Sequence, residues 1–83
     1  MLNVALNAGR YEIVQSVTRR CSEFGNVRSI RLFLGSAPTV VIEMSTPKQT
    51  EALAMSLDGK LVGPTAFIDL ANDPNEVRQR EVA

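Results

Sequence analysis

The sequence predicts a single α+β domain, in which two helices cover one face of a four-stranded antiparallel sheet, with the elements in the order βαββαβ. Two observations carry this expectation. Apolar residues alternate with polar ones on four short segments, which is the period of a strand with one buried face. On two intervening segments the apolar residues recur every three or four positions, the spacing of a helix with one apolar face. A chain of 83 residues suffices for one hydrophobic core.

The opening third of the chain predicts the first strand and the first helix. Leu2, Val4 and Leu6 alternate with polar or small residues, which indicates a half-buried strand. A helix is expected over residues 10–24, where apolar side chains recur at helical spacing. Gly25 suits the left-handed conformation that commonly ends a helix, so the boundary is placed before it.

A hairpin is predicted next. Val27–Leu34 and Thr39–Met44 each alternate apolar and polar side chains, and a short connection joins them. Two strands this close in sequence pair most economically as an antiparallel hairpin.

The second helix carries a start signal. Thr46 can cap it, Pro47 suits its first position, and Gln49 occupies the reciprocal site of a capping box. Its inner face is expected to consist of Thr50, Leu53, Ala54 and Leu57.

The last strand is expected at Thr65–Leu70, where apolar and polar residues alternate again. The domain is therefore assigned to residues 1–71. Residues 72–83 form a C-terminal tail, in which Asp73 and Pro74 can begin a short helix.

Two stretches resemble the RNA recognition motif (RRM) domain family. They are "FGNV" at residues 24–27 and "ALAMSLDGKLVGPTAFIDLA" at residues 52–71. The resemblance covers residues 1–71 and implies a ferredoxin-like sandwich with the strand order 4-1-3-2. Within it, Gly25 and Gly59 are expected to reverse the chain with positive φ. The resemblance also implies that single-stranded RNA binds on the open face of the sheet.

The chain departs from the family at the positions of the stacking aromatic residues. The family places these residues on the first and third strands. Here the third-strand positions hold Thr39 and Val41, and the first-strand position holds Ala5, or Val4 in a register shifted by one. The expected surface is therefore an RRM-like face without its central aromatics.

Strand parity predicts which residues that open face presents, because successive side chains point to opposite sides of a sheet. The expected set is Asn3, Ala5, Arg31, Phe33, Thr39, Val41, Glu43, Phe67 and Asp69. In the order 4-1-3-2, Phe33 and Phe67 lie on the two edges, roughly 14 Å apart. In the tail, Arg78 and Arg80 are expected to add phosphate contacts, whereas Lys48 and Lys60 are expected on the helix side.

Composition argues against several functional classes. The formal net charge is +0, whereas a dedicated nucleic-acid binder carries a basic excess. The chain has no histidine and one cysteine, Cys21, so we expect no metal site, no cofactor and no catalytic activity. Cys21 is expected to be a small core residue rather than a nucleophile. No apolar run reaches membrane length, so a cytoplasmic protein without a membrane partner is expected.

Two functional hypotheses remain in order of preference. The first is a module that binds single-stranded RNA weakly on the open sheet face, with Phe33 and Phe67 as stacking residues and Arg31 contacting phosphate or a base. The second is a protein–protein interaction module, homodimerising or adaptor, in which a partner covers the same apolar residues. A third class, small-molecule-binding regulatory domains with a ferredoxin-like fold, has the same element order. It is less favoured because the connection "LDGKLVG" resembles the RRM family more closely.

Overall fold

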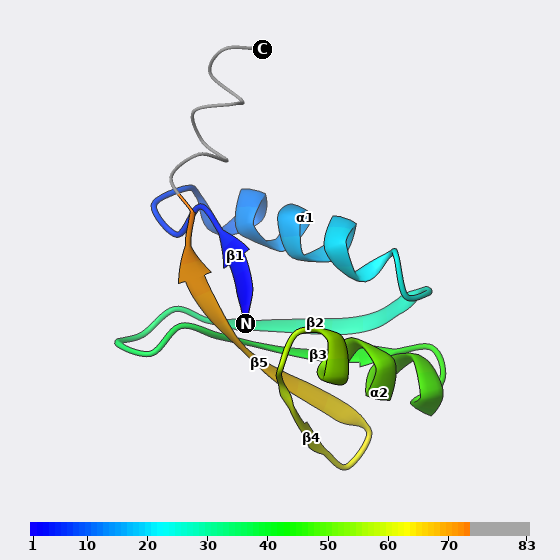
Figure 1. Cartoon of the computed structure of the whole chain (residues 1–83). Helices are drawn as coiled ribbons and strands as arrows, with labels where there is room; N and C mark the ends of the chain where they lie inside the picture. Colours follow the sequence, from blue (N-terminus) through cyan, green and yellow to red (C-terminus); the bar gives the residue numbers. More distant parts are fainter. Residues whose placement is uncertain (74–83) are drawn as a thin grey trace.

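The computed structural model describes residues 1–73, which form two helices and a five-stranded mixed sheet (Figure 1). In chain order the elements are β1 Leu2–Val4, α1 Arg10–Cys21, β2 Val27–Phe33, β3 Thr39–Met44, α2 Pro47–Ser56, β4 Lys60–Val62 and β5 Thr65–Asn72. The α+β class, both helices and the four expected strands are therefore confirmed. The tail residues Arg78 and Arg80 lie outside the described residues.

The order of the strands corrects the prediction. The sheet has the order β1-β5-β3-β2, so β5 lies inside the sheet and β1 lies at an edge, parallel to β5. The four-stranded antiparallel order 4-1-3-2 was wrong. The lengths supply a reason: β1 has three residues and β5 has eight, so β1 offers too few hydrogen bonds to separate β5 from β3. β3 and β5 pair directly instead, from Thr39 with Asp69 to Ile42 with Ala66.

β4 is an element that the sequence prediction missed. Lys60–Val62 pairs antiparallel with the first part of β5, whereas β1 pairs with its last part, from Leu70 to Asn72 (Figure 1). Two short strands, β4 and β1, thus pair one after the other along the same edge of the long β5. The sequence analysis places no strand between the second helix and Thr65, because three residues between Gly59 and Gly63 are too few to show alternation.

The core lies between the sheet and the two helices. It is formed by the inward-facing residues of the strands, such as Val40, Ile42 and Ile68, packed against Ile13 and Leu53 of the helices. Burying a side chain of this size contributes roughly 1.5–3 kcal/mol. The predicted inner face of α2 is confirmed, since all four of its residues are buried.

The start of α2 forms largely as predicted. The hydroxyl of Thr46 accepts a hydrogen bond from the backbone N–H of Gln49 at 3.2 Å. The Gln49 side chain does not return that bond in the structure; its Oε1 accepts a hydrogen bond from the Ser45 hydroxyl at 2.8 Å. The cap therefore forms without its reciprocal half.

The two predicted glycine turns have different outcomes. Gly25 has a φ of 142°, as expected for a residue that reverses the chain. Gly59 does not have positive φ; Asp58 before it has a φ of 54°. Gly59 is needed for close packing instead, because a Cβ there would lie 2.8 Å from the carbonyl oxygen of Phe67.

Candidate functional site

One row of side chains crosses four strands on the open face of the sheet. Lys60 lies opposite Phe67, Phe67 opposite Val41, and Val41 opposite Arg31. In strand order the row reads Lys60, Phe67, Val41, Arg31, so an aromatic ring and an aliphatic side chain lie between two cations. Directly opposed side chains in neighbouring strands lie about 4.5–5.5 Å apart at Cβ, close enough to form one continuous surface.

A second row lies beside the first. Phe33 is opposite Thr39, and Thr39 is opposite Asp69. The Thr39 hydroxyl donates a hydrogen bond to the carbonyl of Ala37 at 3.0 Å, so its oxygen can still accept one. This row adds an aromatic residue at one end and a carboxylate at the other.

Glu43 continues the face towards the start of β2. It pairs in register with Ser29, where the ladder is irregular, and its carboxylate lies 3.8 Å from the guanidinium of Arg28. The Arg28 side chain is largely exposed, so this ion pair contributes at most about 1 kcal/mol. It still reduces the charge that Arg28 offers to a ligand.

The exposures confirm the predicted parity. Phe33 and Phe67 are 53% and 39% exposed, whereas Phe24 is half-buried against the core. The pattern of the sequence predicts that Phe24 is less exposed than both strand phenylalanines, which is confirmed, and that it is buried beside Leu53 or Leu57, whereas it is only half-buried. Asn3, Arg31 and Asp69 are exposed, and Thr39 and Glu43 are half-buried.

Two expected site residues contribute little accessible surface. Ala5 is 6% exposed and lies beyond the end of β1, where its carbonyl accepts a hydrogen bond from the N–H of Ala8 at 2.9 Å. It was predicted on the open face, and the early end of the strand explains the error. Val41 does lie on the face, but at 9% exposed it is covered by its neighbours.

The separation of the two phenylalanines also differs from the expectation. With β5 next to β3, Phe67 and Phe33 are separated by two strand spacings across the sheet and by two residues along it, hence by roughly 12 Å rather than 14 Å. Phe67 therefore occupies the interior of the sheet, with β3 on one side of its strand and β4 on the other.

β4 brings to the face a residue that the sequence prediction placed elsewhere. Lys60 was expected on the helix side, but its pairing with Phe67 puts it on the open face. An open hollow beside it is lined by Thr39, Asp58, Gly59, Lys60, Phe67 and Asp69. The available signal was the pair of apolar residues Leu61 and Val62 directly after Lys60, but three residues are too few to predict a strand.

The charges of this face are only partly neutralised. Within residues 1–73, Arg31, Lys60 and Asp69 form neither an ion pair nor a side-chain hydrogen bond. They therefore remain available to a ligand. The two free cations lie at opposite ends of the row that contains Phe67.

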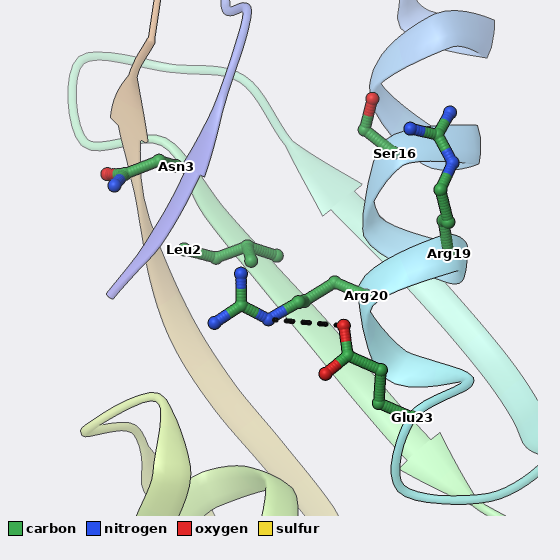
Figure 2. A pocket seen from close by; sticks show the side chains of 6 residues that line it. All are labelled: Leu2, Asn3, Ser16, Arg19, Arg20 and Glu23. Atoms are coloured by element: carbon green, nitrogen blue, oxygen red, sulfur yellow. Dashed lines mark ion pairs between the residues drawn. The ribbon is translucent and has the colours of Figure 1, made fainter. Parts of the chain in front are cut away.

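Two other hollows lie near α1. The first, shown in Figure 2, lies between β1 and α1 and includes Leu2, Arg19 and Arg20. There Arg20 Nε lies 3.8 Å from a carboxylate oxygen of Glu23, and both side chains are exposed. The second borders the outer edge of β2, where Arg10 donates a hydrogen bond to the carbonyl of Leu32 at 2.7 Å. Arg10 thereby occupies one acceptor of that open strand edge.

Cys21 has the environment of a core residue. It is fully buried in the last turn of α1. Burial raises the pKa of its thiol to about 11, although Arg20 nearby acts in the opposite direction. A thiol with such a high pKa is a poor nucleophile at neutral pH, because the thiolate is the reactive form.

Comparisons of the chain with protein-family models, curated proteins and solved structures found no match. In the part of the chain that the structure describes, neither helix is long and apolar enough to cross a membrane.

Proposed function

We propose that this protein is a small RRM-like module that binds single-stranded RNA on the open face of its sheet. The observation that supports this most is the row Lys60, Phe67, Val41, Arg31, which places an exposed aromatic ring between two free cations. Stacking on aromatic rings and contacts to phosphates are the two interactions with which proteins hold single strands.

The proposed affinity is modest. A neutral chain offers few phosphate contacts, and Glu43 and Asp69 place two carboxylates on the same face. Phe67 and Phe33 supply two stacking sites, each worth roughly 1–3 kcal/mol by alanine substitution. The proposal includes the sequence-based expectations of membership in the RRM family, a cytoplasmic location and no catalytic activity.

An NMR titration tests the proposal. Pooled short single-stranded RNAs added at low salt should shift the amide signals of β3 and β5 on the open-face positions, and added salt should reverse these shifts. A helix-face response, or no response at all, would contradict it. DNA duplexes of the same length provide a control for unspecific charge attraction.

A protein interface is the second candidate. The observation that favours it is the exposed apolar end of β2, where Phe33 and Leu34 are 53% and 42% exposed. Burial of such residues does not depend on counterion release, so association through them should persist at moderate salt. Measuring the solution mass at the low and the raised salt concentration of the titration distinguishes the two candidates. A dimer that persists at the raised concentration, with no RNA-induced shifts, favours the protein interface.

A further inference from the structure

The hollow beside the β4–β5 hairpin combines a stacking ring with a free carboxylate. It measures about 400 Å³, within the roughly 300–1,000 Å³ of small-ligand sites. The ring is that of Phe67, and the free carboxylate is that of Asp69; Lys60, Thr39 and a second carboxylate, that of Asp58, also line the hollow. Gly59, which directly precedes β4, also lines the hollow and brings no side chain to it.

We propose that this hollow selects guanine in single-stranded RNA, with the base stacked on Phe67 and its Watson–Crick edge bound by Asp69. This inference rests on the proposed RNA-binding function and names the base that the site accepts.

The spacing of the two residues suits one base. Phe67 and Asp69 are two positions apart on β5 and project from the same face, so their Cα atoms lie roughly 6.6 Å apart along the strand. A base stacked on the ring of Phe67 extends toward Asp69, and a hydrogen bond of about 2.9 Å bridges the remaining distance.

The chemistry of the carboxylate distinguishes guanine from the other bases. An ionised carboxylate has two oxygens and only accepts hydrogen bonds. Guanine presents two adjacent donors, N1–H and the N2 amino group, which together match both oxygens. Adenine and cytosine present one amino group beside a ring acceptor, and uracil presents one N–H between two carbonyls. Only guanine can therefore donate two hydrogen bonds to the carboxylate. Each of the other bases would place one of its own acceptor atoms against a carboxylate oxygen.

The neighbouring residues complete the arrangement. Lys60 is opposite Phe67 on β4 and supplies a cation for the phosphate of the same nucleotide. Thr39 is opposite Asp69 on β3, and its hydroxyl oxygen is available as a further acceptor. Asp69 forms no hydrogen bond or ion pair within residues 1–73, so a base does not have to displace an internal partner.

Four RNAs of seven nucleotides test the inference with the full chain. One is all uridine, and the other three carry a single central guanosine, adenosine or cytidine. A single guanosine avoids structures formed by guanine runs. The expected result is about ten-fold tighter binding of the guanosine RNA, which is a typical discrimination by one bidentate contact. The amide signals of Phe67 and Asp69 should shift most with that RNA.

Asp69→Asn separates recognition from general binding. This variant should lose the preference for guanosine, because the NH₂ group of the asparagine amide would face an N–H donor of guanine instead of accepting its hydrogen bond. Its affinity for the all-uridine RNA should stay equal or rise, since a negative charge has been removed. Glu51→Gln, which removes one exposed charge from α2 on the opposite layer, serves as the matched control and should keep the preference.

Each remaining outcome contradicts the inference. Equal affinity for all four RNAs, with shifts on the sheet face, would overturn guanine selection and leave the proposed function standing. A preference for guanosine that survives in Asp69→Asn would assign recognition to another group. The absence of shifts with every RNA would overturn the inference together with the proposed function.

Discussion

Phe67 combines an interior position in the sheet with an exposed ring, and this combination makes it the residue on which RNA binding should depend most. Its strand has neighbours on both sides, and its ring points away from the helices. A ligand stacked there can contact both adjacent strands. Phe33 lies on the edge strand β2, where a ligand has support on one side only.

Phe67→Ala should therefore weaken binding of single-stranded RNA by roughly 1–3 kcal/mol, the usual worth of one base–aromatic stack. Fluorescence anisotropy with a short labelled RNA would measure the loss. Tyr11→Ala is the matched control, because Tyr11 is a 74% exposed aromatic residue on α1, away from the sheet face. Equal losses in both variants would show that the sheet face is not the binding site.

Cys21 predicts a change in stability at alkaline pH. Its thiol has a pKa of about 11 in the folded protein because burial disfavours the thiolate. The unfolded chain ionises at lower pH, near the ordinary value of 9. The stabilising effect of the neutral thiol is thus fully present below pH 9 and is lost as the pH rises through 11. The free energy of unfolding should fall in this window by up to about 1.4 kcal/mol per pH unit.

Urea unfolding at several pH values would measure this dependence. Cys21→Ala should be less stable at neutral pH, because it leaves a small cavity, but its stability should fall less steeply between pH 9 and 11. Identical slopes in the two proteins would mean that Cys21 does not account for the alkaline loss.

At the scale of elements, the β4–β5 hairpin determines the shape of the candidate site. β4 carries Lys60 to the open face, and Gly59 allows the two strands to approach closely. A side chain at residue 59 would meet the Phe67 carbonyl and the Ile68 side chain, both at 2.8 Å. Backbone atoms cannot move aside as a flexible side chain can, so the hairpin itself would have to shift.

Gly59→Ala should consequently destabilise the fold by roughly 1–3 kcal/mol, the typical cost of overpacking. Thermal unfolding would measure the effect. Gly35→Ala is the control, since a Cβ at that position has no atom within 4 Å and the residue has no positive φ. If the two variants unfold at the same temperature, the close approach at Gly59 does not constrain the hairpin.

The sequence predicts which segments are helices and strands better than it predicts which strands pair with one another. Alternation alone shows that Arg31, Phe33 and Phe67 point away from the helices, because parity is a local property of each strand. Whether Leu2 pairs with Leu70 or lies beside β3 is a question of long-range pairing, which alternation does not address. Lys60 was misplaced for a related reason: three residues between two glycines carry no periodic signal, and only pairing with β5 makes them a strand.

At the scale of the whole molecule, charge limits how strongly the protein can hold RNA. The chain has no net charge, and on the open face Arg31 and Lys60 have no ion-pair partner within residues 1–73. Each phosphate contact to a single strand contributes about −0.7 to the slope of log K against log salt. Two contacts predict a slope of about −1.4, far shallower than that of a basic nucleic-acid binder.

Arg31→Ala should reduce this slope to about −0.7, because one phosphate contact is lost. Titrations at four or more salt concentrations would measure it. Lys48→Ala removes an exposed cation from α2 on the helix side and should leave the slope unchanged. A steeper slope in the wild-type protein would indicate contacts from residues outside this face.

The edge position of β1 also has a consequence for the order in which the protein folds. β4 and β5 meet across a tight turn, whereas β1 must find a partner at the far end of the chain; the hydrogen bond from the Leu6 N–H to Asn72 spans 66 positions. Closing a loop of that length costs on the order of 4 kcal/mol of chain entropy. β1 should therefore dock last and detach first, by local opening. While it is detached, the last part of β5 exposes an unpaired edge that β1 of a second molecule could fill, so strand exchange at high concentration would begin there.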